Sequence, residues 1–122
     1  MDKVEIEILL DFIIENIELV EKRFKKIKDV DDFLNEEDLT ILDAISMRLQ
    51  ARKEALKNIN KKDSDFLLQV ADKEYWSKII KTREIISHHY INLDAEIVYI
   101  ICNEKLNELK ENIIKLKNSF RR

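Results

Sequence analysis

The amino-acid sequence contains neither glycine nor proline. At average usage, a chain of this length would hold about eight glycines and about six prolines. Sheet proteins use these residues in hairpin turns and bulges, and α/β proteins use glycine in tight strand–helix loops. Their absence therefore predicts a few long helices joined by short turns built from asparagine and aspartate.

The same absence excludes several classes of chemistry. Phosphate-cradling loops, dinucleotide fingerprints and nucleophile elbows each need a backbone conformation that only glycine adopts cheaply. The chain is therefore not expected to bind a nucleotide by any of those routes. Its 122 residues suit a single domain spanning residues 1–122.

The net charge and the cysteine content limit which partners and which cellular compartment we expect. The net charge of −3 is too mild to indicate a partner, so any contact with RNA must come from a local basic patch. The single Cys102 excludes an internal disulfide and a cysteine zinc site. The longest clearly apolar run, Ile97 to Cys102, is far shorter than the ~20 residues of a membrane span. We expect a cytoplasmic protein with no membrane partner.

Apolar residues at steps of three and four predict the helices. The first stripe predicts a helix of about 25 residues and comprises Ile6, Leu10, Ile13, Ile17, Val20, Phe24 and Ile27. After an acidic connector at 29–38, in which Phe33 and Leu34 should pack on the bundle, a second stripe comprises Leu42, Ile45, Leu49, Leu56 and Ile59. Arg52 interrupts the second stripe, so it either extends its head to solvent or lies beside a polar group that it serves.

The second half of the chain predicts a turn and two further helical regions. The turn covers 58–65, with Asn60 as a left-handed cap, and the third region covers 66–90 with a break near Asp72. The last helix begins at Asn92 and Asp94, and its stripe comprises Val98, Cys102, Leu106, Leu109, Ile113, Leu116 and Phe120. Cys102 is thus predicted to be a core residue. The pattern favours an all-α, antiparallel four-helix bundle; the turns disfavour the alternative, a long coiled coil.

Residues 73–90 carry the candidate chemistry, including both histidines and two of the three tyrosines. On a helical wheel with Arg83 at zero, Ser87 falls at about 40°, Glu84 at about 100° and His88 at about 140°. Together with Tyr90 at about 340°, this edge could hold a phosphate and move a proton.

Each of these residues also has a purely structural explanation. Arginine, glutamate and histidine on a helix often form only a solvated face. His88 and His89 diverge by about 100° and cannot both bind one metal ion, so no metal site is expected. Trp76 fits an anchor packed in the bundle better than a platform for stacking bases.

The arrangement Arg83-x4-His88-x-Tyr90 resembles the signature of the HepT-like toxins, which belong to the HEPN superfamily of small helical ribonucleases. Four further segments resemble family segments in the same order, so the likeness spans most of the chain: 32–34, 49–55, 76–83 and 90–94.

The resemblance implies a metal-independent endoribonuclease toxin, with no cofactor, that acts as a homodimer with a composite cleft. RNA is the implied substrate, with tRNA a candidate, and the products would carry 2′,3′-cyclic phosphate ends. Arg83 would bind the scissile phosphate and His88 would act as general acid or base. Tyr90 would be modified with AMP by a cognate minimal nucleotidyltransferase antitoxin. Glu84, Ser87 and Glu54 would support the site.

Two open points concern RNA binding and the alternatives to catalysis. Lys78, Lys81 and Arg52 could supply the local positive field if the second and third helical regions pack together. Glu84 stands beside Arg83 and could compete with phosphate for it. A non-catalytic docking partner of a nucleotidyltransferase is therefore the second hypothesis, and a purely structural helical adaptor is the third.

Overall fold

The computed structural model describes residues 3–35, 39–81 and 91–120, and within these ranges the regular structure is entirely helical. The elements are α1 (Lys3–Phe24), α2 (Val30–Leu34), α3 (Thr40–Lys62), α4 (Ser64–Leu67), α5 (Lys73–Ile80), α6 (Ile91–Ile100), the π-helical turn η1 (Ile101–Lys105) and α7 (Leu106–Asn118). The expected all-α class is confirmed. The four-helix count and the homodimer stay predictions.

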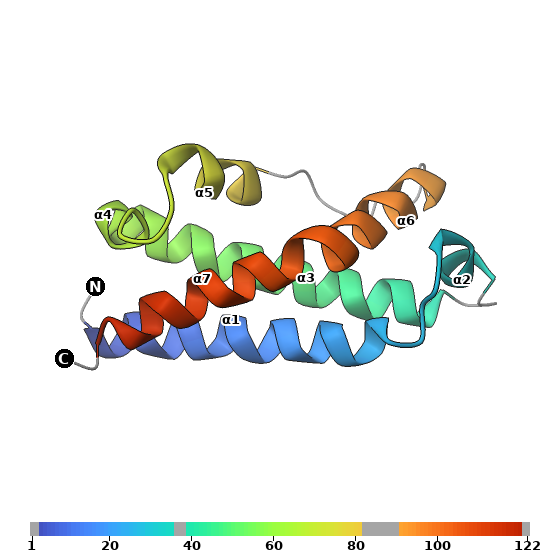
Figure 1. Ribbon diagram of the computed structural model, residues 1–122, viewed down its shortest axis with the longest axis horizontal. Coiled ribbons are helices and arrows are strands. Elements are labelled where there is room, and N and C mark those ends of the chain that lie inside the picture. Colours follow the sequence, from blue (N-terminus) through green and yellow to red (C-terminus); the bar gives the residue numbers. More distant parts are fainter. Residues whose placement is uncertain (1–2, 36–38, 82–90, 121–122) are drawn as a thin grey trace.

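The helices form an elongated molecule built on α1 and α3. These two long helices lie along one another, and α7 packs across α1 (Figure 1). The short helices α4 and α5 contact α3, whereas α2 contacts α6 at the other end of the molecule (Figure 1). Residues 82–90, which carry the family signature, thus fall in the chain between α5 and α6.

The core is made by the predicted stripes. In α1, Ile6, Leu10, Ile13, Ile17 and Val20 are all buried, although the helix ends at Phe24, before the predicted Ile27. Ile27 is nevertheless buried in the turn that follows. Burying such aliphatic side chains stabilises a fold by about 1.5–3 kcal/mol each.

An aspartate caps the N-terminus of each of the three short helices, α2, α4 and α5. Asp29, Asp63 and Asp72 each accept a hydrogen bond from the backbone N–H three residues later, at 3.1, 3.3 and 2.8 Å. Such caps contribute about 1 kcal/mol each because they satisfy an amide that the helix leaves unpaired. The connector prediction is also confirmed, because Phe33 in α2 is fully buried and Leu34 packs on the core.

The chain turns within the predicted range 58–65, but the left-handed cap predicted at Asn60 is wrong. The helix α3 continues through Asn60 to Lys62, and the chain turns at Asp63. Ile59 is buried and keeps the stripe in register, while Lys61 and Lys62 interact favourably with the negative end of the helix dipole. Among the described residues, positive φ occurs at Leu39 (φ 57°), not at Asn60.

The break near Asp72 is confirmed, and Trp76 stabilises it. Residues 68–72 separate α4 from α5, which frees backbone carbonyls that a continuous helix would satisfy. The Trp76 indole N–H donates to the carbonyls of Leu67 (2.8 Å) and Ala71 (3.1 Å), and its side chain is 2% exposed. Trp76 is therefore the packed anchor that the sequence indicated.

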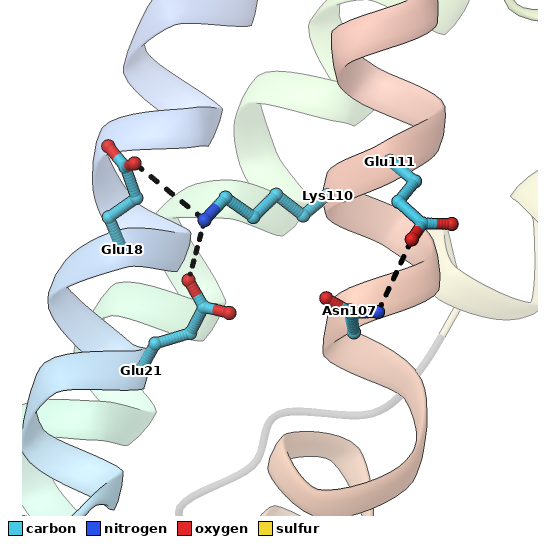
Figure 2. Close-up of polar contacts among 5 residues, drawn as sticks. All are labelled: Glu18, Glu21, Asn107, Lys110 and Glu111. Atoms are coloured by element: carbon cyan, nitrogen blue, oxygen red, sulfur yellow. Dashed lines mark hydrogen bonds and ion pairs between the residues drawn. The ribbon is translucent and has the colours of Figure 1, made fainter.

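Lys110 joins α7 to α1. Its ammonium group lies 3.0 Å from Glu21 and 3.7 Å from Glu18, whereas Asn107 and Glu111 pair with each other along α7 (Figure 2). The hydrogen bond with Glu21 raises the pKa of Lys110. Lys110 thereby helps to set the position of α7 along α1. Within the described ranges, none of the helices has the length and apolar character needed to span a membrane.

Candidate functional site

The predicted catalytic cluster lies outside the described residues. This applies to Arg83, Glu84, Ser87, His88 and Tyr90 alike. The structure does place the elements on both sides of the cluster, because α5 ends at Ile80 and α6 begins at Ile91.

A cavity of about 490 Å³ lies between α3, α5, α6, η1 and α7, and we call it the Arg52 pocket. Its polar lining consists of Arg52, Tyr75, Lys78, Lys105 and Glu108. Two of its walls come from the helices that flank residues 82–90 in the chain. The pocket is therefore lined by both of the helices between which the signature falls in the chain.

Arg52 is buried at the inner side of this pocket and is only 6% exposed. The interpretation that its head reaches solvent is therefore wrong, and the alternative, that it lies beside polar groups, is confirmed. Among the described residues, Cys102 and Tyr75 are the groups whose charges interact with the Arg52 guanidinium. Burial lowers the pKa of Arg52 to about 10, so the guanidinium stays charged at neutral pH.

The side chains of Tyr75 and Cys102 interact with the Arg52 charge but do not neutralise it. Burial raises the pKa of Tyr75, against a hydrogen bond from the Asn112 side chain that lowers it. Burial also raises the pKa of the Cys102 thiol to about 12, despite the neighbouring Arg52. Both groups are neutral at physiological pH, which agrees with the prediction that Cys102 is a packing residue.

Isoleucines make the apolar wall of the pocket. Ile79 comes from α5, Ile97 and Ile100 from α6, and Ile101 from η1, with Leu109 of α7 completing the wall. The N–H of Leu106 donates to the carbonyl of Ile101, which is the five-residue spacing of a π-helix. Such turns occur often at functional sites, and this one places Ile101 and Lys105 together on the pocket.

The structure brings together two of the three predicted RNA-binding residues in this pocket. Arg52 and Lys78 line it from α3 and α5, which contact each other as the sequence hypothesis required. Lys81 lies beside Lys78 in a neighbouring surface hollow. Glu54 is exposed on α3, where it accepts a hydrogen bond from Gln50 at 3.3 Å, and it does not line the pocket.

Sequence reasoning missed Tyr75, Lys105 and Glu108 as members of one pocket. A usable signal was the small Cys102 in a stripe of large aliphatic residues, since a small side chain leaves room for a bulky neighbour such as Arg52. Chemically, the pocket can hold an anion with an apolar body. Within the described ranges, no group of three or more histidine, cysteine, aspartate or glutamate side chains could hold a metal ion.

Comparison with known proteins places this geometry in a family. The family model described as Ribonuclease HepT-like matches residues 13–116. A protein of Methanocaldococcus jannaschii named "Gamma-glutamylcyclotransferase and putative RNase" is 28% identical over 112 residues, which cover 92% of this chain and 47% of that protein. This chain thus spans about half of the length of that relative. No solved structure matches the chain. Because the family match covers most of the chain, including the whole signature, the chain belongs to the HepT-like ribonuclease family.

Proposed function

We propose that the protein is a metal-independent endoribonuclease that cleaves RNA in a composite cleft between two copies of the chain. The observation that carries the proposal is the family match over residues 13–116, which contains Arg83, His88 and Tyr90 at the spacing of the family signature. The relative in Methanocaldococcus jannaschii, whose name includes an RNase function, supports the same activity.

The proposed reaction needs only a phosphate-binding cation and a proton carrier. The 2′-hydroxyl attacks the adjacent phosphorus and the 5′-oxygen of the next nucleotide leaves, so that a 2′,3′-cyclic phosphate and a 5′-hydroxyl form. Arg83 neutralises charge on the phosphorane, and His88 removes the proton from the 2′-hydroxyl or supplies one to the leaving oxygen. Glu84 and Ser87 would help to position these two side chains.

Two proposed partners follow from family membership. A second copy of the chain would complete the cleft, and a minimal nucleotidyltransferase antitoxin would transfer AMP to Tyr90. Bulky, anionic AMP at the mouth of the cleft would exclude RNA by steric overlap and by repulsion between like charges.

The test is cleavage of total tRNA in the presence of EDTA by protein whose Tyr90 is shown by mass spectrometry to be unmodified. We expect the wild-type protein to yield cyclic phosphate ends, and Arg83→Ala and His88→Ala to be inactive. His89→Ala is the matched control, because it removes the adjacent histidine, which falls outside the signature, and it should retain activity.

Mixing the two inactive variants tests the composite cleft. If Arg83 acts across the dimer on the same phosphate as His88 of the other copy, a mixture of Arg83→Ala and His88→Ala chains should regain about a quarter of the wild-type activity. No recovery would place both residues in one chain. Intact RNA with every preparation would instead favour the non-catalytic docking partner, with Glu84 neutralising Arg83.

A further inference from the structure

The Arg52 pocket contains a buried positive charge that no described residue balances. Arg52 is 6% exposed, and its Nε donates to the carbonyl of Leu49 at 3.4 Å. Among residues 3–35, 39–81 and 91–120, no carboxylate forms an ion pair with it. Buried guanidinium groups are strongly unfavourable without an anionic partner, so this one indicates that the pocket receives an anion.

The rest of the polar lining also favours an anion. Lys105 adds a cation at an exposed position, and so does Lys78, which also pairs with the carboxylate of Glu74 at 3.4 Å outside the pocket; Glu108 is the one carboxylate among the described lining residues. Tyr75 presents a neutral phenol on the α5 side. With Lys78 paired to Glu74, and Lys105 and Glu108 of opposite sign, the positive character of the described lining comes mainly from Arg52, in a chain whose net charge is −3.

Size and apolar lining narrow the class of anion. The volume of about 490 Å³ falls within the range of roughly 300–1,000 Å³ typical of pockets for small ligands. The isoleucine wall would gain nothing from an inorganic ion, but it can cover a flat apolar group. The planar guanidinium offers paired donors that match two oxygens of one phosphate.

We propose that the Arg52 pocket binds one nucleotide, with the phosphate on Arg52 and the base against the wall formed by Ile97, Ile100 and Ile101. The nucleotide is either free or a unit of an RNA chain. The second source rests on the proposed ribonuclease function, whereas the first does not.

Trp76 gives a direct readout of occupancy. It is the single tryptophan of the chain, and its ring lies 5.0 Å from that of Tyr75, which lines the pocket. Titration with AMP, with UMP, with inorganic phosphate and with a fully 2′-O-methylated RNA oligonucleotide should change its emission, excited at the red edge to avoid absorption by the bases. The methylated RNA cannot be cleaved because the attacking hydroxyl is blocked, so binding is measured apart from catalysis.

The proposal predicts how substitutions in the pocket change nucleotide binding. Arg52→Met should weaken nucleotide binding by about tenfold or more, and Lys105→Gln, a surface change that leaves the core intact, should weaken it by a smaller factor. The matched control is Lys115→Gln on α7, which removes an exposed lysine that does not line the pocket. It should bind as the wild-type protein does.

The outcomes separate the two sources of the nucleotide. Equal or tighter binding of AMP or UMP than of RNA assigns the pocket to a free nucleotide, even if no RNA is ever cleaved. Much tighter binding of RNA, lost in Arg52→Met, assigns it to a subsite of the ribonuclease. The proposal is overturned if none of the probes bind, if inorganic phosphate binds as tightly as the nucleotides, or if Arg52→Met and Lys105→Gln both bind normally. Binding that appears only in Glu84→Gln would also overturn it, since the anion would then be a side chain of the protein itself.

Discussion

Arg52→Met should make the unliganded protein more stable. The substitution removes the buried charge and replaces it with an unbranched apolar side chain of similar length, which can fill an irregular space. Exchange of buried charged groups for well-packed apolar residues is often neutral or stabilising, because the desolvation penalty disappears with the charge.

The magnitude follows from the pKa of Arg52, which burial lowers from the ordinary value of an arginine to about 10. A shift of this size corresponds to about 3 kcal/mol by which the folded state disfavours the charged form, since one pKa unit is about 1.4 kcal/mol. Between pH 10 and the ordinary pKa of arginine the unfolded chain binds more protons than the folded chain, so the stability of the wild-type protein rises with pH there. Below pH 10 the penalty is present in full. Subtracting about 1 kcal/mol for the lost Arg52 to Leu49 hydrogen bond leaves a net gain of about 2 kcal/mol at neutral pH.

Urea denaturation followed by circular dichroism, at one fixed protein concentration, measures this gain. For a domain of this size a gain of about 2 kcal/mol corresponds to a rise in Tm of about 8 °C. Arg48→Met, one turn earlier on α3, is the matched control. Arg48 is half-buried and donates to Asn16 at 3.2 Å, so its replacement should be neutral or destabilising by about 1 kcal/mol. A loss of stability in Arg52→Met would refute the reasoning, because it would mean that the guanidinium has a favourable partner in the unliganded protein.

Four further predictions concern Trp76, Cys102 and Lys110. Trp76→Phe deletes the indole N–H that serves the carbonyls of Leu67 and Ala71, and should lower the free energy of unfolding by about 1–3 kcal/mol in the same urea assay; an unchanged midpoint would contradict the anchoring role. Because burial raises the Cys102 pKa from 9.0 to about 12, iodoacetamide should alkylate the native thiol at least about 100-fold more slowly than in strong urea. The unfolded thiol also ionises at lower pH than the folded one, so the wild-type protein should lose stability relative to Cys102→Ala as pH rises from 9 toward 12; parallel pH profiles would count against this. Lys110→Met should cost about 0.5–1 kcal/mol at low salt and less at high salt, as expected for a partly exposed ion-pair network; a loss independent of salt would point to packing instead.

The helices were predictable because their signal is local and repeated. The first stripe, from Ile6 to Val20, and the last, from Leu106 to Leu116, are buried as the three-four spacing required. The break at Asp72 was also predictable, since an aspartate followed by a charged first turn is a standard helix start. In each case the information lies within a few neighbouring residues.

The left-handed cap predicted at Asn60 failed for the opposite reason. Asparagine adopts left-handed conformations more readily than most residues, but Ile59 packs in the core and holds the helix in register for another turn. Leu39, with φ of 57°, shows the same competition, because leucine has no intrinsic preference for that conformation. At Ile59 tertiary packing outweighs the local propensity of Asn60, and at Leu39 the local propensity likewise does not report the conformation.

The same contrast between local sequence signals and tertiary contacts applies to the candidate site. The signature could be read directly from the spacing of Arg83, His88 and Tyr90, whereas the Arg52 pocket depends on five elements meeting in space. The π-helical turn was not predictable from the stripe, because Val98, Cys102 and Leu106 keep a spacing that an ordinary helix also accommodates. In the sequence, the pocket is indicated by the interruption at Arg52 and by the small Cys102 in a stripe of large aliphatic residues.

A chain without glycine has few ways to hold a phosphate with its backbone, so its side chains must do it. Lysines at exposed positions are mobile and strongly hydrated, and they attract phosphate without fixing its orientation. Arg52 is held in the middle of a long helix and buried among neutral groups, so its charge is already desolvated and oriented before any ligand arrives. Such preorganisation strengthens binding at the expense of the stability of the empty protein. A single variant separates this account from a structural one. If Arg52→Met gains stability and loses nucleotide binding, the charge is there for a ligand. If it gains stability and still binds, the pocket does not use its charge, and Lys78 and Lys81, which are close to the signature in sequence, are then the candidate contacts of RNA.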